Sequence, residues 1–422
     1  MRSVPIRHIA DVWTSSVDKH TVEGESPIQM CNYTDAYKKD CVRPGPDLMR
    51  ATATPTEIAR NRLKVGDSVF TKDSEDPSDI GISAFVDGEA DDFVCGYHLA
   101  IARPHAATHP RFLNWALRSR PVLEHFGNYA AGISRYGIGL SDLRSAPIPL
   151  MENKDQRRIA SFLDEHVSRI DRIIAARRNQ ALLVSAAELE HVRSATTLAG
   201  SSATRASGIP WMPAIGRDAV LWRFGQAFET GSGTTPKSDR AEYYNGHIPW
   251  VTTSDLRDRR ITDLPRSVTD AAMRDYSALR VFPPGTVMIA MYGATVGRLG
   301  RLEIPACVNQ ACCALIERGP VTLDYAFFWL LAYRSEIMGL ASGSGQPNIS
   351  QEIVRGLQIP VPNRKKQKEI VAELEDYTVS TQRLNEALAR SITLLGEYQS
   401  SLITAAVSGE LDVTTAGSTI PR

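Results

Sequence analysis

The chain has 422 residues, which is too long for one ordinary hydrophobic core and predicts two to four domains. Its composition, 43% hydrophobic and 23% charged, is ordinary for a globular protein. The formal net charge of zero excludes a strongly acidic DNA mimic. A nucleic-acid partner would therefore have to be bound through local basic patches or with additional subunits.

Neither targeting signals nor metal-binding patterns stand out. The N-terminus has no long apolar stretch, and the longest apolar runs, such as Val287–Tyr292 and Tyr325–Tyr333, are too short to cross a membrane. We therefore expect a cytoplasmic protein without a membrane partner. The six cysteines form no C-x-x-C pair, so we expect no metal site and reduced thiols.

The elements follow one another in a clear order. Residues 1–150 are predicted to form a mixed, β-rich domain, with a strand at GDSVFTK and a helix at 110–118. A long helix is expected over 151–199 and a polar linker over 200–212. A second mixed domain is expected over 213–362, with a strand, Gly-containing turn and strand in MYGATVGRLGRLEI and a helix at 323–334. A second long helix over 363–411 and a disordered tail over 412–422 complete the chain.

The two long helices carry apolar residues at alternating steps of three and four, which is typical of a coiled-coil seam. His166 is expected on the apolar face, opposite Tyr377, as a packed core residue. Neither seam is stable in water, so each helix needs a partner, and the simplest partner is the other helix. The residues predicted to pair the helices are Ile159, Leu163, His166, Ile170, Ile173, Ile370, Leu374, Tyr377, Leu384, Leu388, Leu395 and Leu402.

The two halves of the chain are repeats of each other. When the sequence is shifted by 211 residues, RYGIGLSDLRSAPIPLMENKDQRRIASFLDE aligns with QPNISQEIVRGLQIPVPNRKKQKEIVAELED without a gap. Ile148-Pro149 then matches Ile359-Pro360, and Gln156 matches Gln367. Earlier segments match more loosely, as in IQMCNYTD and IPWVTTSD. The predicted fold class is therefore α+β: two mixed α/β domains in tandem, each followed by a long helix, with the helices paired as an antiparallel coiled coil.

Common catalytic motifs are absent from the sequence. It contains no G-x-x-x-x-G-K-[ST], no H-E-x-x-H, no G-x-S-x-G and no Asn-Pro-Pro-aromatic stretch. This favours a binding protein over an enzyme.

The length of the paired helices sets the distance between the two domains. Antiparallel pairing of two helices, each of about 40 residues and so about 60 Å long, predicts two recognition surfaces separated by more than one turn of B-DNA, about 34 Å. The simplest hypothesis is a non-catalytic protein that reads two separated short DNA sites. Two alternatives remain: a DNA-modifying enzyme with a fused reader, and a coiled-coil scaffold that binds only protein.

The architecture and several stretches resemble the specificity subunit of type I restriction–modification enzymes. These stretches are GTVMIAMYGATVGRLG, CVNQACCAL, NISQEIVRGLQIPVPNRKKQKEIVAELE and SLITAAVSGELDV; the first half is more divergent. The resemblance implies a non-catalytic subunit that reads a bipartite, asymmetric target in double-stranded DNA. It also implies two modification (methyltransferase) subunits and restriction subunits as partners. S-adenosylmethionine, ATP and magnesium would be cofactors of those partners, with none held by this chain.

Bases would be read by polar loop residues, and each candidate has the alternative of being an ordinary solvated side chain. The loop SGSGQPNIS is the strongest single candidate, because AGISRYGIG occupies the same place in the first half. The candidates are Asn32, Lys38, Lys39, Lys72, Arg135 and Tyr136 in the first domain, and Thr235, Lys237, Arg240, Thr252, Ser254, Tyr292, Arg298, Ser344, Gln346 and Asn348 in the second.

Overall fold

The computed structural model describes residues 2–198, 202–341 and 348–415. The chain divides into two compact units: residues 1–178 with 389–422, and residues 179–388. Each unit contains one globular domain and one half of each long helix. The units are described separately below.

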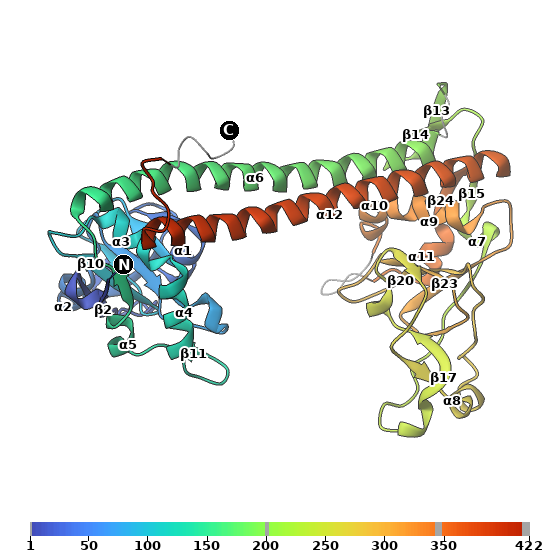
Figure 1. Ribbon diagram of the computed structural model, residues 1–422. Helices are drawn as coiled ribbons and strands as arrows, with labels where there is room; N and C mark the ends of the chain where they lie inside the picture. Colours follow the sequence, from blue (N-terminus) through green and yellow to red (C-terminus); the bar gives the residue numbers. More distant parts are fainter. Residues whose placement is uncertain (1, 199–201, 342–347, 416–422) are drawn as a thin grey trace. The chain divides into compact units, whose positions relative to one another are not determined.

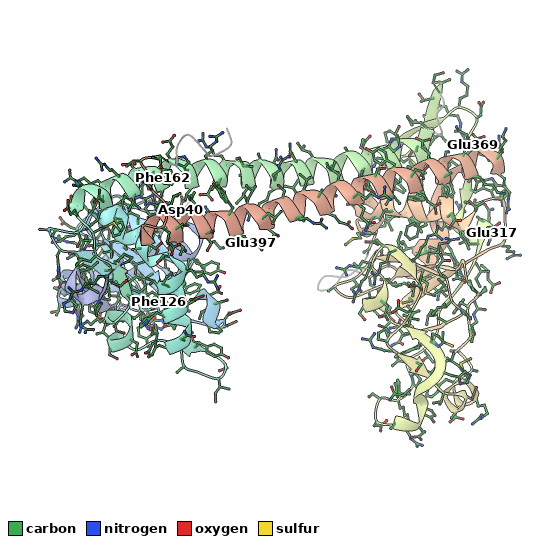
Figure 2. All side chains as sticks on the ribbon, in the orientation of Figure 1. Asp40, Phe126, Phe162, Glu317, Glu369 and Glu397 are labelled. Carbon is green, nitrogen blue, oxygen red and sulfur yellow. The ribbon has the colours of Figure 1, made fainter. Side chains whose placement is uncertain are left out.

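The first domain is built on a five-stranded sheet (Figure 1). Alternate residues of its central strands face two different cores, as the period of two in a strand requires. Phe70 and Ala100 face the cluster that contains the two covering helices, whereas Val69 and Ile101 face a second cluster. Phe126, labelled in Figure 2, stacks on Phe70 with 5.7 Å between ring centroids. The strand order is β2 (Ala10–Thr14), β10 (Leu99–Pro104), β6 (Ser68–Thr71), β8 (Ser83–Val86) and β4 (Cys41–Val42), and the covering helices are α3 (Pro110–Leu117) and α4 (Arg120–Tyr129).

Smaller sheets complete the first domain. A three-stranded sheet has the order β5 (Met49–Ala53), β3 (Ser26–Cys31), β9 (Phe93–Cys95). The first strand of the domain, β1 (Ser3–Pro5), pairs with the last, β12 (Pro147–Pro149), and β7 (Asp73–Ser74) pairs with β11 (Tyr136–Gly137). The short helices are η1 (Ile6–His8), α1 (Tyr33–Lys38), α2 (Pro55–Asn61), η2 (Pro77–Asp79) and α5 (Leu140–Arg144).

The second domain repeats the five-stranded sheet, the three-stranded sheet and the terminal strand pair of the first domain. Its five-stranded sheet has the order β16 (Phe228–Gly231), β23 (Cys312–Glu317), β20 (Val287–Ala290), β21 (Leu299–Leu302), β18 (Arg259–Ile261), again with a parallel last pair. The three-stranded sheet has the order β19 (Ser267–Val268), β17 (Tyr244–Val251), β22 (Cys307–Val308), and β15 (Val220–Arg223) pairs with β24 (Gln358–Val361). The helices are α7 (Phe224–Ala227), η3 (Ala241–Tyr243), η4 (Thr253–Asp255), α8 (Asp270–Asp275), α9 (Leu323–Ala332), α10 (Arg334–Met338) and α11 (Gln351–Gly356).

The duplicated Ile-Pro joint has the same structure in both domains. Ile148 and Ile359 are fully buried in their cores. Behind each joint, a buried glutamine accepts a hydrogen bond from the backbone at the start of the domain's main helix. Gln156 Oε1 accepts from His109 N at 2.7 Å, and Gln367 Oε1 accepts from Thr322 N at 2.8 Å. The repeat therefore preserves a buried connection between each domain and the helix that leaves it.

The long helices α6 (Asn153–Leu198) and α12 (Arg364–Ser408) pack side by side (Figure 1). In the first unit, Leu163 and Ile170 share a core with Leu402. In the second unit, Val192 shares a core with Leu374. Gln399 donates to Asp171 at 2.8 Å, and Asn385 donates to Ser185 at 3.5 Å, so residue numbers fall on one helix as they rise on the other. The predicted antiparallel coiled coil between tandem α/β domains is confirmed.

The structure corrects the position of part of the seam. Ile173 and Leu384 are exposed, and the neighbouring residues Ile174 and Asn385 face inward instead. The sequence pattern misled because a leucine beside an asparagine favours the leucine as the seam residue. The remaining predicted seam residues are buried or partly buried: Ile159, Leu163, His166, Ile170, Ile370, Leu374, Tyr377, Leu388, Leu395 and Leu402.

His166 does not lie opposite Tyr377. The His166 ring stacks on Phe162, with 4.1 Å between centroids, and its Nδ1 lies 2.8 Å from the Phe162 carbonyl oxygen. Tyr377 packs on His191 instead, with 4.3 Å between centroids. The antiparallel register explains the difference. His166 and Tyr377 occupy the same position in the two repeats, but His166 lies in the first unit and Tyr377 in the second, so the two side chains do not meet.

Leucine-to-alanine variants at two positions of α12 test the corrected seam. Leu374 is fully buried, whereas Leu384 is 47% exposed. We expect Leu374→Ala to lower the free energy of unfolding of the second unit by about 2–4 kcal/mol, and Leu384→Ala to lower it by less than about 0.5 kcal/mol. Urea unfolding of both variants measures the difference; equal losses would contradict this seam.

Two segments predicted to lack regular structure also differ from the expectation. The linker predicted over 200–212 contains a strand, β13 (Thr204–Ile209), which pairs with β14 (Met212–Gly216). Trp211 in the turn packs on Tyr333, with 5.3 Å between ring centroids, and this burial explains the order. Within the predicted disordered tail, Val413 packs on the first unit's core and Asp412 accepts a hydrogen bond from Thr414 N at 2.9 Å. In the described ranges, no helix has the length and hydrophobicity needed to span a membrane.

Candidate nucleic-acid interface

Four segments of the first domain meet at one end of its sheets. Backbone hydrogen bonds join them: Gly96 N donates to Cys31 O at 2.9 Å, Lys72 N to His98 O at 3.2 Å, and Ile138 N to Lys72 O at 3.0 Å. The segments are the ends of β3, β6 and β9 and the short strand β11. Loops brought together on a rigid sheet are a common place for binding residues.

A charged network occupies this end of the first domain. The Asp73 carboxylate accepts from Lys72 Nζ and Arg135 Nη2, each at 2.8 Å, and lies 2.8 Å from His98 Nδ1. Lys72 Nζ also lies 4.4 Å from the centroid of the Tyr97 ring, which is 50% exposed. Two of the predicted candidates, Lys72 and Arg135, are thus brought together on a residue that was not predicted.

The pKa of Asp73 reflects this setting. Burial raises it, but the hydrogen bonds from Lys72 and Arg135 and the nearby charges outweigh burial, so the net pKa lies below its usual value. A carboxyl whose pKa is lower in the folded state than in the unfolded state stabilises the fold above its ordinary pKa. That contribution is lost as the pH falls through the folded-state pKa. At neutral pH, therefore, Asp73 is ionised and holds its cations.

The other candidates of the first domain have local structural roles or lie at the edge of the network. Asn32 caps α1, because its side chain accepts from Tyr33 N at 2.7 Å. Lys39 pairs with Asp35 at 2.9 Å, and Lys38 is exposed at the end of α1. Tyr136 lies in β11 opposite Ser74.

The corresponding end of the second domain is formed by hydroxyl and amide groups. Thr252 and Ser254 stand at the start of η4, where their hydroxyl oxygens lie 2.9 Å apart, and Arg266 Nη1 donates to Thr252 Oγ1 at 3.0 Å. Thr235 Oγ1 donates to Gln310 Oε1 at 2.6 Å. Thr252 and Asp255 form a capping box, just as Asn32 and Asp35 do in the first domain.

The remaining candidates of the second domain are more scattered. Tyr292 and Asn348 form a β-bridge, equivalent to the pairing of Asp73 with Gly137 in the first domain. Arg298 is exposed. Arg240 pairs with Glu242 at 3.1 Å, and the Lys237 backbone donates to Tyr276 Oη at 3.0 Å. Ser344 and Gln346 lie outside the described residues.

Five residues of these surfaces were not predicted from the sequence: Asp73, Tyr97 and His98 in the first domain, and Gln310 and Arg266 in the second. The repeat contained a signal for some of them. The strands β9 and β22 occupy the same place, so Gly96–His98 matches Asn309–Ala311. Aligning CGYHLA with VNQACC would have identified Tyr97 and Gln310 as equivalent loop residues.

The two equivalent surfaces differ in chemistry. The first carries cations and aromatic rings around a carboxylate, and the second carries hydroxyls, an amide and an arginine that pairs with Asp255 at 3.3 Å. Both sets suit base edges: arginine and lysine match guanine, and glutamine matches adenine. Within residues 2–198, 202–341 and 348–415, no three His, Cys, Asp or Glu side chains are placed to hold a metal ion.

Duplicated domains on paired helices present two polar surfaces of unlike chemistry at equivalent places. Comparisons with known proteins place this architecture among known families. Residues 219–394 match the family described as "Type I restriction modification DNA specificity domain". The MjaIX specificity subunit of a type I restriction enzyme from Methanocaldococcus jannaschii is 28% identical over 173 residues, which cover 38% of this chain. The match covers 39% of the length of that curated relative.

Two solved structures share the fold along almost the whole chain. One, from work on complex assembly and conformational transition of the type I R-M system, has a TM-score of 0.73 at 18% identity and covers 97% of this chain and 98% of its own. The HsdS subunit from Thermoanaerobacter tengcongensis has a TM-score of 0.53 at 18% identity, with 97% of each chain covered. The resemblance to type I specificity subunits is thereby confirmed, and residues 219–394 match the DNA specificity domain of that family.

Proposed function

We propose that this chain is the DNA-reading subunit of a type I restriction–modification complex. One observation carries the proposal: two domains of the same topology present different polar side chains at the same place. Shared topology with different surface chemistry suits two modules that read different base pairs. The target is then bipartite and asymmetric, with one half-site for each domain in double-stranded DNA.

The complex supplies the chemistry in this proposal. The chain itself is non-catalytic and holds no cofactor. Two methyltransferase subunits, which use S-adenosylmethionine, and restriction subunits, which use ATP and magnesium, assemble on it. The paired helices act as the spacer between the domains and as part of the docking surface.

Two grooves at equivalent places support docking along the helices. In the first unit, a groove of about 470 Å³ lies between α3 and α6 and is lined by Trp115 and Asp164. In the second unit, a groove of about 620 Å³ lies between α9 and α12 and is lined by Phe328 and Glu375. The same helices of the repeat form both grooves, which suits two copies of one kind of partner.

The test is genome-wide mapping of methylated adenine. Cells that express the chain with its candidate methyltransferase are compared with cells that lack only this chain. We expect a split, asymmetric motif that disappears with the chain. An active, co-purifying methyltransferase without any chain-dependent motif would overturn the proposal.

The alternative, a scaffold that binds only protein, makes a different prediction. DNA binding by the assembled complex should weaken steeply with salt if the chain contributes phosphate contacts. A scaffold without DNA readout predicts no change in that salt dependence when the chain's exposed cations are removed.

A further inference from the structure

The segment Ala131–Gly137 of the first domain forms a small, tightly built hairpin. Ala131 and Gly137 exchange two backbone hydrogen bonds, each of 3.0 Å. A Cβ atom at Gly132 would lie 1.9 Å from the Arg135 carbonyl oxygen, so the turn needs glycine there. At the tip, the Ile133 side chain is 98% exposed. The hairpin therefore projects from the domain while its backbone is fixed.

Arg135 is held on one side only. Its Nη2 donates to Asp73 Oδ1 at 2.8 Å and lies 2.9 Å from His98 Nδ1, yet the side chain remains 55% exposed. All bonds that the described residues make to this guanidinium use Nη2. An arginine has five N–H donors, so the donors on its other two nitrogens remain available to a ligand.

The position of Asp73 is unexpected for a surface that meets DNA, because a carboxylate repels phosphates. Asp73 is only 8% exposed, however, and lies among Lys72, His98 and Arg135. Two cations therefore surround one shielded carboxylate, and the network keeps a net positive charge even with neutral histidine. A buried acid of this kind suits holding cations in place rather than binding ligand.

The fold itself does not require this carboxylate. At the equivalent place of the second domain, Tyr292 forms the bridge with Asn348 that Asp73 forms with Gly137. The same topology thus tolerates an uncharged residue there. This separates the role of Asp73 from the construction of the sheet.

We propose that Asp73 is a positioning residue that fixes Arg135 on the Ala131–Gly137 hairpin, so that Arg135 reads a guanine in the first half-site. Fixing the guanidinium before binding removes the entropy cost of ordering a long side chain. Its free donors then match the O6 and N7 acceptors of guanine in the major groove. This inference rests on the proposed function and adds a residue-level mechanism to it.

The test compares four versions of the chain, each assembled with its methyltransferase subunits: Asp73→Asn, Arg135→Ala, the double variant, and Arg60→Ala. Arg60 is an exposed arginine on α2, so its variant controls for the loss of one positive charge. Methylation rates are measured on oligonucleotides in which each base pair of both half-sites is changed in turn.

We expect Asp73→Asn and Arg135→Ala to lose about tenfold in discrimination at the same G·C pair of the first half-site, with the second half-site unchanged. The double variant should be no worse than Arg135→Ala, because both changes remove one interaction. Arg60→Ala should keep full discrimination. Equal weakening at both half-sites, or additive losses in the double variant, would overturn the proposal.

If Asp73→Asn does not fold, variants of Arg135 still test the proposal, because the Arg135 side chain is exposed and its replacement should not unfold the domain. Arg135→Lys retains the charge but loses the paired donors, so it should lose discrimination as Arg135→Ala does. Unchanged discrimination in Arg135→Lys or Arg135→Ala would refute the inference. If the unaltered chain directs no methylation at any motif, the proposed function itself is wrong. If the unaltered chain directs methylation and the variants read the first half-site normally, only the role of Asp73 and Arg135 is wrong.

Discussion

Replacing Gln367 by alanine should lower the free energy of unfolding of the second unit by about 3 kcal/mol. Gln367 is fully buried, and its amide makes three hydrogen bonds: from Thr322 N at 2.8 Å, and to Pro320 O and Pro362 O, each at 2.9 Å. In the variant, all three backbone groups lose this hydrogen-bond partner at a buried site. Urea unfolding followed by tryptophan fluorescence measures the loss, because Trp329 lies in the core of the same unit.

The equivalent residue of the first unit provides a matched comparison. Gln156 is 6% exposed and makes two such bonds, from His109 N at 2.7 Å and to Met151 O at 2.9 Å. Gln156→Ala should therefore cost less than Gln367→Ala and should destabilise the first unit. Hydrogen exchange assigns each loss to its unit. A loss below about 0.5 kcal/mol for both variants would show that water replaces the glutamine without cost.

Inserting one heptad into each long helix should lengthen the gap between the two half-sites and leave both half-sites unchanged. Seven residues preserve the seam because its period is 3.5 residues, and they add about 10 Å of helix. That length equals about three base pairs of B-DNA. Insertion after Ala181 and after Leu388 keeps the added turns opposite each other, as the Ser185–Asn385 contact indicates. Mapping of methylated adenine gives the new gap.

Unmatched insertions serve as controls. A heptad in only one helix gives the seam no partner over seven residues, so the protein should lose stability and directed methylation together. Altered half-sites with an unchanged gap in the matched variant would refute the spacer role of the helices.

The parts of the fold that depend on local pattern could be predicted. The repeated joint, the two long helices and the helices near residues 110 and 323 follow from periodicity and turn chemistry in single segments. The residue that faces the partner helix could not be predicted at Leu384 and Asn385. These residues are neighbours, and hydrophobicity alone favours the leucine, which is the exposed one. The antiparallel register decided between them, and it depends on the partner helix.

The candidate surface could be predicted only in part. Lys72 and Arg135 were recognisable as candidates by residue type. Asp73 and His98 were not, since the contacts of Asp73 with His98 and Arg135 span 25 and 62 residues of sequence. Such contacts arise from strand pairing across the domain, and no local pattern encodes them. Asn32 and Thr252, conversely, proved to be helix caps, a role that polar residues fill as readily as binding.

The pairing of each domain's first and last strands has an evolutionary consequence. Ser3 pairs with Pro149, and Val220 pairs with Val361, so the chain enters and leaves each domain through two adjacent antiparallel strands. Everything between those strands is one continuous cassette whose two ends lie side by side. Recombination at these strands can exchange a whole cassette in one step, provided that the new cassette preserves the contacts with Gln156 or Gln367 of the long helices. New combinations of the two cassettes can therefore arise by crossing over rather than by gradual change of individual residues.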